Sequence, residues 1–350
     1  MPYRSRALAV AWFLALAFSA GGCFRASEPS GEAIPSRTVK FLGFDASAPL
    51  VEAIGSGQLQ GIVVQNPFRM GQMGVKTIVD ALEKKPVQAK VSTGETLVTR
   101  ENMKTAEVMP LLNPPKVAHT ADSSLTGGKA KKWRILVIPK GTSHEFWKTI
   151  HAGASKAAVE LGNVEIVWQG PQREDDRTEQ IKLVQNAVAA KVDGLVLAPL
   201  DKKALVAPVE KAIAAGIPVV IIDSGLDSSK IVSYVATDNY HGGVLAAERM
   251  ADLLRGEGKI ILMRYAVGSE STEQRESGFV DTIARYPKIT YLSKNEYAGP
   301  TSDSAQKTAQ SLITRYRGQV DGIFCSNESS TAGMLRVLKD AGLLASRPKP

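Results

Sequence analysis

The hydrophobic residues of this chain fall into short apolar runs that alternate with segments of helical periodicity. The stretch "WRILVIPKG", which begins at Trp133, is apolar on both faces, as is typical of a strand covered by helices on both sides of a parallel sheet. The alternation continues to residue 341, which favours doubly wound parallel sheets. Strands are predicted at "VEIVWQG", "DGLVLAPL", "IPVVIID", "VSYVATD", "KIILMRY", "ITYLSKN" and "DGIFCSN", and helices at 145–161, 176–190, 202–215, 242–255, 272–286, 301–317 and 329–341.

Residues 38–115 show the same alternation on a smaller scale. "TVKFLGF" and "LQGIVVQN" are predicted strands, "APLVEAIGSG" and "MGQMGVKTIVDALEKK" are predicted helices, and "GETLVTREN" is a short extended piece. Residues 116–132 have no apolar period and are rich in Ser, Gly and Lys, so we interpret them as a linker. The last predicted helix, 329–341, has no strand after it, although a β-α series would be expected to continue into one.

The first 22 residues are typical of a secretory signal peptide. Arg4 and Arg6 precede the apolar run "ALAVAWFLALAFSA", which suits a signal sequence and is short for a membrane span. The following "SAGGC" resembles a bacterial lipoprotein cleavage site, with Cys23 as the lipidated residue. Ala20 stands where Leu is commoner, so cleavage by the ordinary signal peptidase is the alternative. Residues 23–37 are rich in Ser and Pro and are predicted to be a flexible tether.

Composition narrows the classes of function. The chain is 44% hydrophobic and 22% charged, enough to bury a core, and its net charge of +8 is spread among acidic residues without the aromatic pattern of a nucleic-acid binder. Besides Cys23 there is Cys325, in the apolar "GIFCSN", so no disulfide framework or zinc site is predicted. Because nucleophile elbows and metal-ligand spacings are absent from the sequence, we predict no enzyme activity, no cofactor and no metal.

Residues 133–350 resemble the ribose-binding-protein family, the type I periplasmic solute-binding proteins of sugar importers, from the start of that family to about three quarters of its length. Residues 38–115 resemble the remainder, in which a strand with "GFD" and a strand ending in Gln come last. Together the two parts cover the fold once. The resemblance therefore implies a circular permutation, and an artificial joining of two gene pieces is the alternative.

The family's fold has two doubly wound parallel-sheet lobes joined by a hinge with three crossings. By resemblance, lobe one contains residues 133–236 and 66–95, whereas lobe two contains 237–350, 38–65 and 96–115. The ligand of such a fold lies between the lobes, at the carboxyl ends of the strands.

A sugar site requires polar side chains in the plane of the ring and aromatic side chains against its faces. In "GTSHEFW", the resemblance implies that Phe146 and Trp147 stack on the sugar, with Ser143 and His144 beside them; a purely structural role for Phe146 is the alternative. Asp223 is an implied ligand acceptor, followed by Ser224 where many members have Arg. Tyr297 is a candidate aromatic of lobe two. The remaining implied ligand-binding residues are Asp45, Gln65, Thr237, Arg275 and Asn327.

The resemblance implies an exported monomer that captures a monosaccharide or similar polar solute by closure of its hinge. Its partners would be an ABC-type permease and, through a lipid on Cys23, a membrane, in the periplasm or cell envelope. A module that senses the ligand for a chemoreceptor or sensor kinase is the alternative. A sugar-responsive repressor is disfavoured, because the secretory segment stands where its DNA-binding helices would be.

Overall fold

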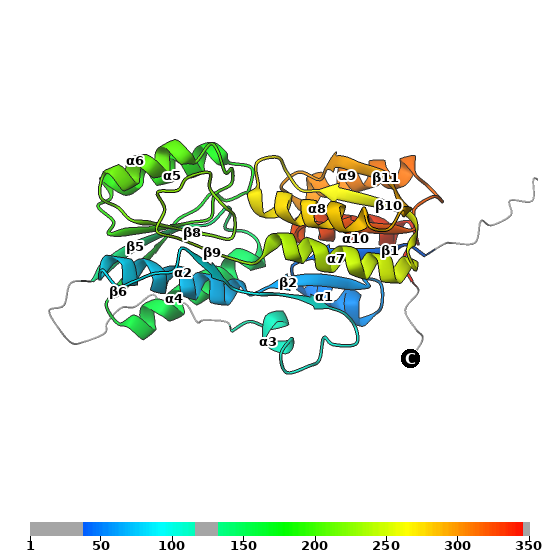
Figure 1. The fold of residues 1–350 in the computed structure, drawn as a ribbon, viewed down its shortest axis with the longest axis horizontal. Coiled ribbons are helices and arrows are strands. Elements are labelled where there is room, and N and C mark those ends of the chain that lie inside the picture. The colour runs from blue at the N-terminus through cyan, green and yellow to red at the C-terminus, as the bar shows by residue number, and fades with distance from the viewer. Residues whose placement is uncertain (1–37, 116–131, 346–350) are drawn as a thin grey trace, which may run out of the picture. The chain divides into compact units, whose positions relative to one another are not determined.

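The computed structural model describes residues 38–115 and 132–345, which form two six-stranded sheets with helices on both faces (Figure 1). This α/β architecture confirms the fold class predicted from the alternating pattern. The predicted signal peptide, Cys23, the tether and nearly all of the predicted linker lie outside the described residues. Within the described ranges, no helix combines the length and apolar character required to span a bilayer.

One sheet joins strands from both ends of the chain, and we call this sheet with its helices lobe two. Its strand order is β11 (Lys288–Tyr297), β10 (Glu257–Arg264), β12 (Gly322–Cys325), β1 (Lys40–Phe44), β2 (Gly61–Gln65) and β4 (Glu95–Val98). The strands are parallel except at one edge, where β4 runs antiparallel to β2. The first strands of the chain therefore occupy interior positions of a sheet whose other half comes from its C-terminal part.

The other sheet, with its helices, is lobe one. Its strand order is β3 (Lys90–Ser92), β9 (Ser233–Ala236), β8 (Val219–Ile222), β7 (Gly194–Leu197), β5 (Trp133–Ile138) and β6 (Val164–Trp168). All of its neighbouring strands are parallel. The sequence pattern did not predict β3, because its three residues are half-buried or exposed and are too few to show a period of two.

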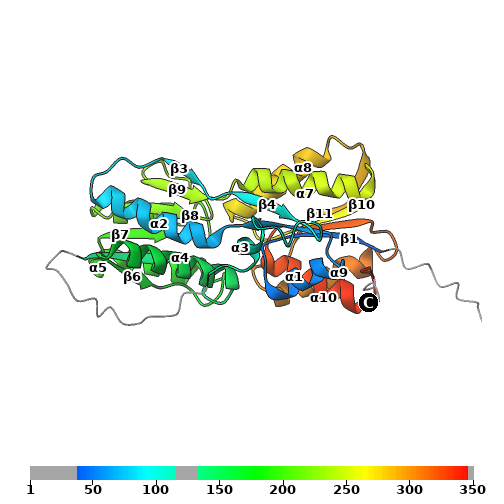
Figure 2. The same cartoon turned by 90° about the horizontal axis from the view of Figure 1, so that it is seen from below.

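Helices cover both faces of each sheet, and four apolar clusters fill the layers between them. Figure 2 shows α7 and α8 on one side of the lobe-two sheet and α1, α9 and α10 on the other. In lobe one, α2 and α4 share one face, whereas α5 and α6 share the opposite face. The bounds are α1 Ala48–Gly55, α2 Pro67–Leu82, α3 Met109–Leu112, α4 Glu145–Leu161, α5 Arg177–Ala189, α6 Val206–Ala214, α7 Asn239–Leu254, α8 Glu270–Ile283, α9 Ser302–Arg315 and α10 Glu328–Asp340.

Glycines let the main chains of two helix pairs touch. A Cβ at Gly153 of α4 would lie 1.9 Å from the carbonyl oxygen of Phe68 in α2, and a Cβ at Gly278 of α8 would lie 2.0 Å from that of Tyr240 in α7. Contacts this short exclude any side chain at these positions. The α2–α4 crossing fastens the N-terminal block to lobe one, and the α7–α8 crossing fixes the height of α8 over its sheet.

The two ends of the described chain meet in lobe two. The backbone N–H of Val39 donates to the carbonyl of Leu343 over 2.9 Å, and that of Lys40 donates to Asp321 over 2.9 Å. Strand β1 therefore begins beside the residues that directly follow α10.

Candidate functional site

The predicted ligand-binding residues gather around a cavity at the carboxyl ends of strands from both sheets. The cavity encloses about 340 Å³, counted with its opening to solvent. Ser143, which is exposed, and Thr237 are not part of its wall. The wall contains the other eight predicted residues, Asp45, Gln65, His144, Phe146, Trp147, Asp223, Arg275 and Asn327.

Two aspartates occupy matching positions in the two lobes. Asp45 directly follows β1 and Asp223 directly follows β8, with φ angles of 65° and 63°. Each backbone N–H donates to a carbonyl of the neighbouring strand, Asp45 to Val63 over 2.8 Å and Asp223 to Val235 over 3.2 Å. The left-handed region costs an L-residue about 1–2 kcal/mol, and Asp and Asn tolerate it better than other side chains do. This geometry brings one carboxylate from each lobe to the cavity.

Arg275 of α8 is held on several sides. Its Nε donates to Asn239 Oδ1 over 2.9 Å, and its Nη1 donates to the carbonyl of Ser326 over 3.0 Å. The guanidinium carbon lies 3.8 Å from the centre of the Phe44 ring, and Nη1 lies 3.9 Å from Asp45 Oδ2. Its Nη2 is buried and has no hydrogen-bond partner. Arg275 thus presents a fixed, unused donor group at the cavity wall.

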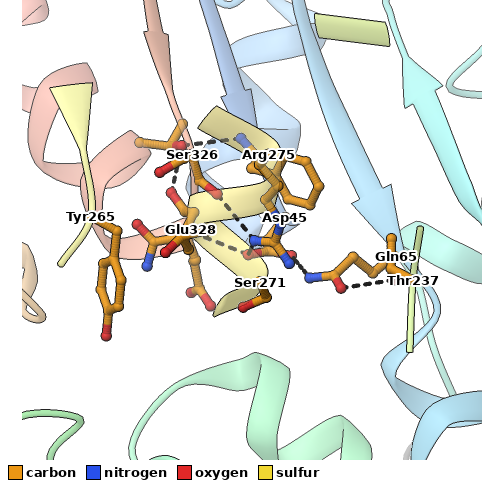
Figure 3. A network of polar contacts seen from close by, with 12 residues as sticks. Asp45, Gln65, Thr237, Tyr265, Ser271, Arg275, Ser326 and Glu328 are labelled. Atoms are coloured by element: carbon orange, nitrogen blue, oxygen red, sulfur yellow. Dashed lines mark hydrogen bonds and ion pairs between the residues drawn. The ribbon is translucent and has the colours of Figure 1, made fainter. Parts of the chain in front are cut away.

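The same network reaches the connections between the lobes (Figure 3). Gln65 Nε2 donates to Asp45 Oδ1 over 2.6 Å, and Gln65 Oε1 accepts from Thr237 Oγ1 over 2.8 Å. Thr237 Oγ1 also lies 3.5 Å from the carbonyl of Gly94, which joins β3 to β4. Within residues 38–115 and 132–345, Gln65, Gly94 and Thr237 lie where the chain passes between the sheets, from β2 to α2, from β3 to β4 and from β9 to α7. Movement at these passages is therefore linked to the position of the Asp45 carboxylate.

Glu174 gathers donors from both lobes at the other side of the cavity. Its Oε1 lies 2.9 Å from His144 Nδ1 and 2.6 Å from Trp147 Nε1, and Oε2 accepts a hydrogen bond from Tyr265 of lobe two. Burial alone would raise the pKa of Glu174, but the hydrogen bond and charge of His144 lower it. Burial alone would lower the pKa of His144, but Glu174 outweighs it and raises that pKa to about 9. The pair is therefore ionic at neutral pH.

This pair predicts a pH dependence that a variant can isolate. Because the folded pKa of His144 lies above its ordinary value of 6.5, the pair stabilises the folded protein fully below pH 6.5 and less as pH rises through about 9. His144→Gln is expected to remove this part of the loss, measured by urea unfolding at several pH values. His241→Gln, on an exposed histidine paired with Glu95, is the control and should keep the wild-type slope. An unchanged slope in His144→Gln would contradict the assignment.

Lys140 ties Asp223 to the opposite lobe. Its Nζ lies 2.9 Å from Asp223 Oδ2 and donates over 3.2 Å to each of Ser269 Oγ and Ser271 Oγ, at the start of α8. Lys140 and Asp223 are 4% and 3% exposed, so the ion pair is shielded from solvent. The three donors of the ammonium group are thus all used.

The side chains of Asn327 and Tyr297 do not make the ligand-facing contacts that the resemblance implies. Asn327 lines the cavity, but its side chain caps α10: Oδ1 accepts from the N–H of Ser330 over 3.2 Å, and Nδ2 donates to Ser329 Oγ over 3.0 Å. Tyr297 is 41% exposed and is not part of the wall, where Tyr265 is the lobe-two aromatic instead. The chain reaches this tyrosine directly after β10.

Sequence reasoning missed part of the wall. Lys140 and Tyr265 stand just after apolar strands, so the rule that singled out Asp223 would have found them. Glu174 carried no such signal, because it lies in the charged run "QREDD" and no strand precedes it directly. The missed wall residues are Lys140, Glu174, Tyr265, Ser271, Thr272 and Glu328.

Fold and site together define a class, a binding protein in which two α/β lobes enclose a polar cavity at the carboxyl ends of their sheets. The periplasmic binding protein domain family matches residues 135–349. The chain belongs to this family.

The known proteins to which this chain is similar are described as solute-binding proteins. A xylitol-binding protein of Mycolicibacterium smegmatis is 28% identical over 184 residues, which are 53% of this chain and only 52% of that protein. A D-ribose/D-allose-binding protein of Pseudomonas aeruginosa is 30% identical over 61% of this chain and 68% of its own. The crystal structure of a solute-binding protein from Agrobacterium vitis with bound D-fucose is 37% identical, with a TM-score of 0.58, covering 60% of this chain and 73% of that one. These descriptions name binding proteins rather than enzymes, as predicted.

Proposed function

We propose that this protein captures a small polyhydroxylated solute, a monosaccharide or sugar alcohol, in the cavity between its lobes. The observation that carries the proposal is the convergence of Asp45 and Arg275 from lobe two with Asp223 from lobe one on one cavity. Carboxylates and a guanidinium suit hydroxyl groups, which both donate and accept hydrogen bonds. The ligands in the relatives' names, xylitol, ribose, allose and fucose, are of this chemical kind.

Phe146 is the aromatic side chain that we assign to the face of the sugar. It is half-buried at the cavity wall, whereas Trp147 is 2% exposed and donates to Glu174. The two rings meet edge to face, with their centroids 4.9 Å apart. Trp147 thereby supports the ring of Phe146 and fixes Glu174.

Closure of the hinge would enclose the ligand, because wall residues come from both lobes. Direct contacts between the lobes already stabilise this arrangement: Lys202 Nζ lies 2.7 Å from Glu273 Oε2, and Glu270 Oε2 accepts from the N–H of Gly225 over 2.8 Å. A ligand that contacts both lobes adds to the stability of the closed form and shifts the population toward it. We further propose that the closed form delivers the solute to an ABC-type importer in the cell envelope.

Thermal unfolding with a panel of xylitol, D-ribose, D-allose and D-fucose tests the binding proposal. A ligand at about a hundred times its dissociation constant should add about 2.7 kcal/mol to the free energy of unfolding. Asp223→Asn is expected to lose this stabilisation, whereas Asp252→Asn, an exposed residue of α7, should keep it. The proposal fails if a wider panel of sugars, sugar alcohols and related polar solutes leaves the midpoint unchanged.

We also propose that the chain is a circular permutant of its family. Supporting this, residues 38–115 supply β1, β2, β3 and α2 to lobes that the family match covers only from residue 135 onward. The bond between Val39 and Leu343 places the ends as neighbours, as in a chain that continues from α10 into β1. Sequencing the transcript across residues 113–133 tests it, because two separate messages would indicate joined gene pieces.

A lipid on Cys23 is the remaining part of the proposal. Support comes from "SAGGC" after the apolar run and from the polar residues that follow it. Growth with an alkyne fatty acid should label the wild-type protein and leave Cys23→Ser unlabelled. Label on Cys23→Ser would refute the assignment.

A further inference from the structure

Acidic side chains outnumber cationic ones in the cavity wall. Four carboxylates face three groups that carry positive charge, since His144 is protonated at neutral pH. Of the four acids in the wall, Glu328 is the one that forms no ion pair with any residue in 38–115 or 132–345. Its Oε2 is buried without a hydrogen-bond partner. The ion pairs of the other three are Lys140 with Asp223 at 2.9 Å, His144 with Glu174 at 2.9 Å, and Arg275 with Asp45 at 3.9 Å.

Glu328 is firmly placed even though its carboxylate is unpaired. It is the first residue of α10, and its backbone N–H donates to Asp45 Oδ2 over 3.2 Å. The capping of α10 by Asn327 fixes the preceding residue. Figure 3 shows Glu328 in the same polar network as Arg275 and Asp45. An acid fixed in this way within a cavity is suited to contact what the cavity binds.

Burial raises the pKa of Glu328 to about 7. His144 opposes this shift, whereas Asp45, Glu174 and Glu145 add to it. Arg275, Lys140 and Asp223 are the other charged groups of the wall, and each has a partner of its own. A ligand that brings a hydrogen-bond donor to the Glu328 carboxyl group would therefore favour its ionised form.

A matching donor lies in the same wall. Arg275 Nη2 is buried and unpartnered, like Glu328 Oε2. An unsatisfied buried polar atom is unfavourable, and a ligand that completes both hydrogen bonds removes two such penalties at once. The pair requires a ligand that offers an acceptor to Arg275 and a donor to Glu328.

We propose that Glu328 is a specificity-determining residue of the cavity, whose carboxylate accepts a hydrogen bond from a donor group of the ligand while Arg275 donates to a ligand oxygen. This inference rests on the proposed solute-binding function and names the group that selects among solutes. The ligand donor is a hydroxyl of a neutral sugar or polyol, or the ammonium group of an amino sugar. Both satisfy the same acceptor, and the experiment separates them.

The test compares wild type with Glu328→Gln and Glu328→Asp by isothermal titration. The ligands are xylitol, D-ribose, D-allose and D-fucose, together with the matched pair D-galactose and D-galactosamine. Glu328→Gln is expected to lower the affinity for the ligand that wild type binds most tightly about tenfold or more at pH 8, since hydrogen bonds to charged groups have this strength. Glu328→Asp keeps the charge on a shorter side chain, so its affinity should lie between those of wild type and Glu328→Gln. Glu179→Gln, an exposed acid of α5, is the control and should match wild type within about twofold.

Ionisation gives a second readout. Because the ligand favours the ionised form, wild-type affinity should rise between pH 6 and 8, whereas Glu328→Gln should lose that rise. The buried Glu276, whose pKa burial also raises to about 7, is unchanged in both proteins and so does not account for the difference. An ammonium ligand is identified if wild type prefers D-galactosamine and the variant loses the preference; a hydroxyl is identified if neutral ligands weaken instead.

Binding by Glu328→Gln within about twofold of wild type, with the wild-type pH profile, would overturn the inference while leaving the proposed function intact. If wild type itself bound none of these solutes, the inference would fail for every class of ligand that it names. Thermal unfolding of each variant establishes that it is folded. Should Glu328→Gln not fold, Glu328→Asp carries the same comparison.

Discussion

Residues 132–345, produced alone, are expected not to fold, although they contain nearly all of the segment that matches the family. The lobe-two sheet would lose the half that follows β12, namely β1, β2 and β4, and with it Phe41 and Phe44, both fully buried. Lobe one would lose α2, which packs against α4 and the sheet. The free energy lost with this much core exceeds the free energy of unfolding of a typical domain, which is about 5–15 kcal/mol. Circular dichroism should show no cooperative unfolding transition.

A reordered chain provides the counterpart. Residues 132–345 followed through two glycines by residues 38–115 should fold, because Val39 and Leu343 are already hydrogen-bonded neighbours. Its free energy of unfolding should lie within about 1–2 kcal/mol of that of residues 38–345, since closure entropy depends weakly on loop length. A control chain opened within β10 should not fold. If residues 38–345 fold and the reordered chain does not, residues 38–115 and 132–345 need their present order.

Arg275→Met is expected to abolish ligand binding and to lower the free energy of unfolding by about 3–5 kcal/mol at pH 8. The substitution leaves the Asp45 carboxylate, 7% exposed, without its cationic neighbour. Burial already raises the pKa of Asp45, and Arg275 is the largest influence that opposes this shift. Without Arg275 that pKa rises further, so protonation at low pH relieves part of the cost.

The pH dependence distinguishes this explanation from simple loss of packing. Urea unfolding should show a smaller deficit at pH 5 than at pH 8, and adding Asp45→Asn to Arg275→Met should recover part of the stability. Arg285→Met, at an exposed position just after α8, should be nearly neutral. A deficit that does not vary with pH would assign the loss to packing on Phe44 rather than to the buried charge.

The fold was accessible from the sequence wherever an element was long enough to show a period. Helix α4 was predicted at 145–161 and spans Glu145–Leu161, whereas α6 was predicted from residue 202 and begins at Val206. Residues 202–205 form turns instead, with Asp201 Oδ1 accepting from the backbone of Lys203 and Ala204. Boundaries of this kind depend on local hydrogen bonds that hydrophobic patterns do not record.

The candidate site was accessible only in part, for a related reason. Asp45, Asp223 and Asn327 stand at strand ends, where a polar residue after an apolar run signals the edge of a sheet. Asn239, at the start of α7, accepts from Arg275 Nε and donates to the carbonyl of Asp223 over 3.3 Å, although its place in the sequence gives no sign of either bond. Such pairings join residues from different elements, so they follow from the packed structure rather than from spacing along the chain.

The meeting of Val39 with Leu343 bears on how the protein would be held. Strand β1 starts at the amino edge of its sheet, and the cavity lies at the carboxyl edge. Thr38 therefore lies at the end of lobe two that is remote from the mouth of the cavity. If the protein is held through the residues before Thr38, as the proposed lipid on Cys23 requires, lobe two is the lobe that is held and lobe one is the lobe that moves during closure.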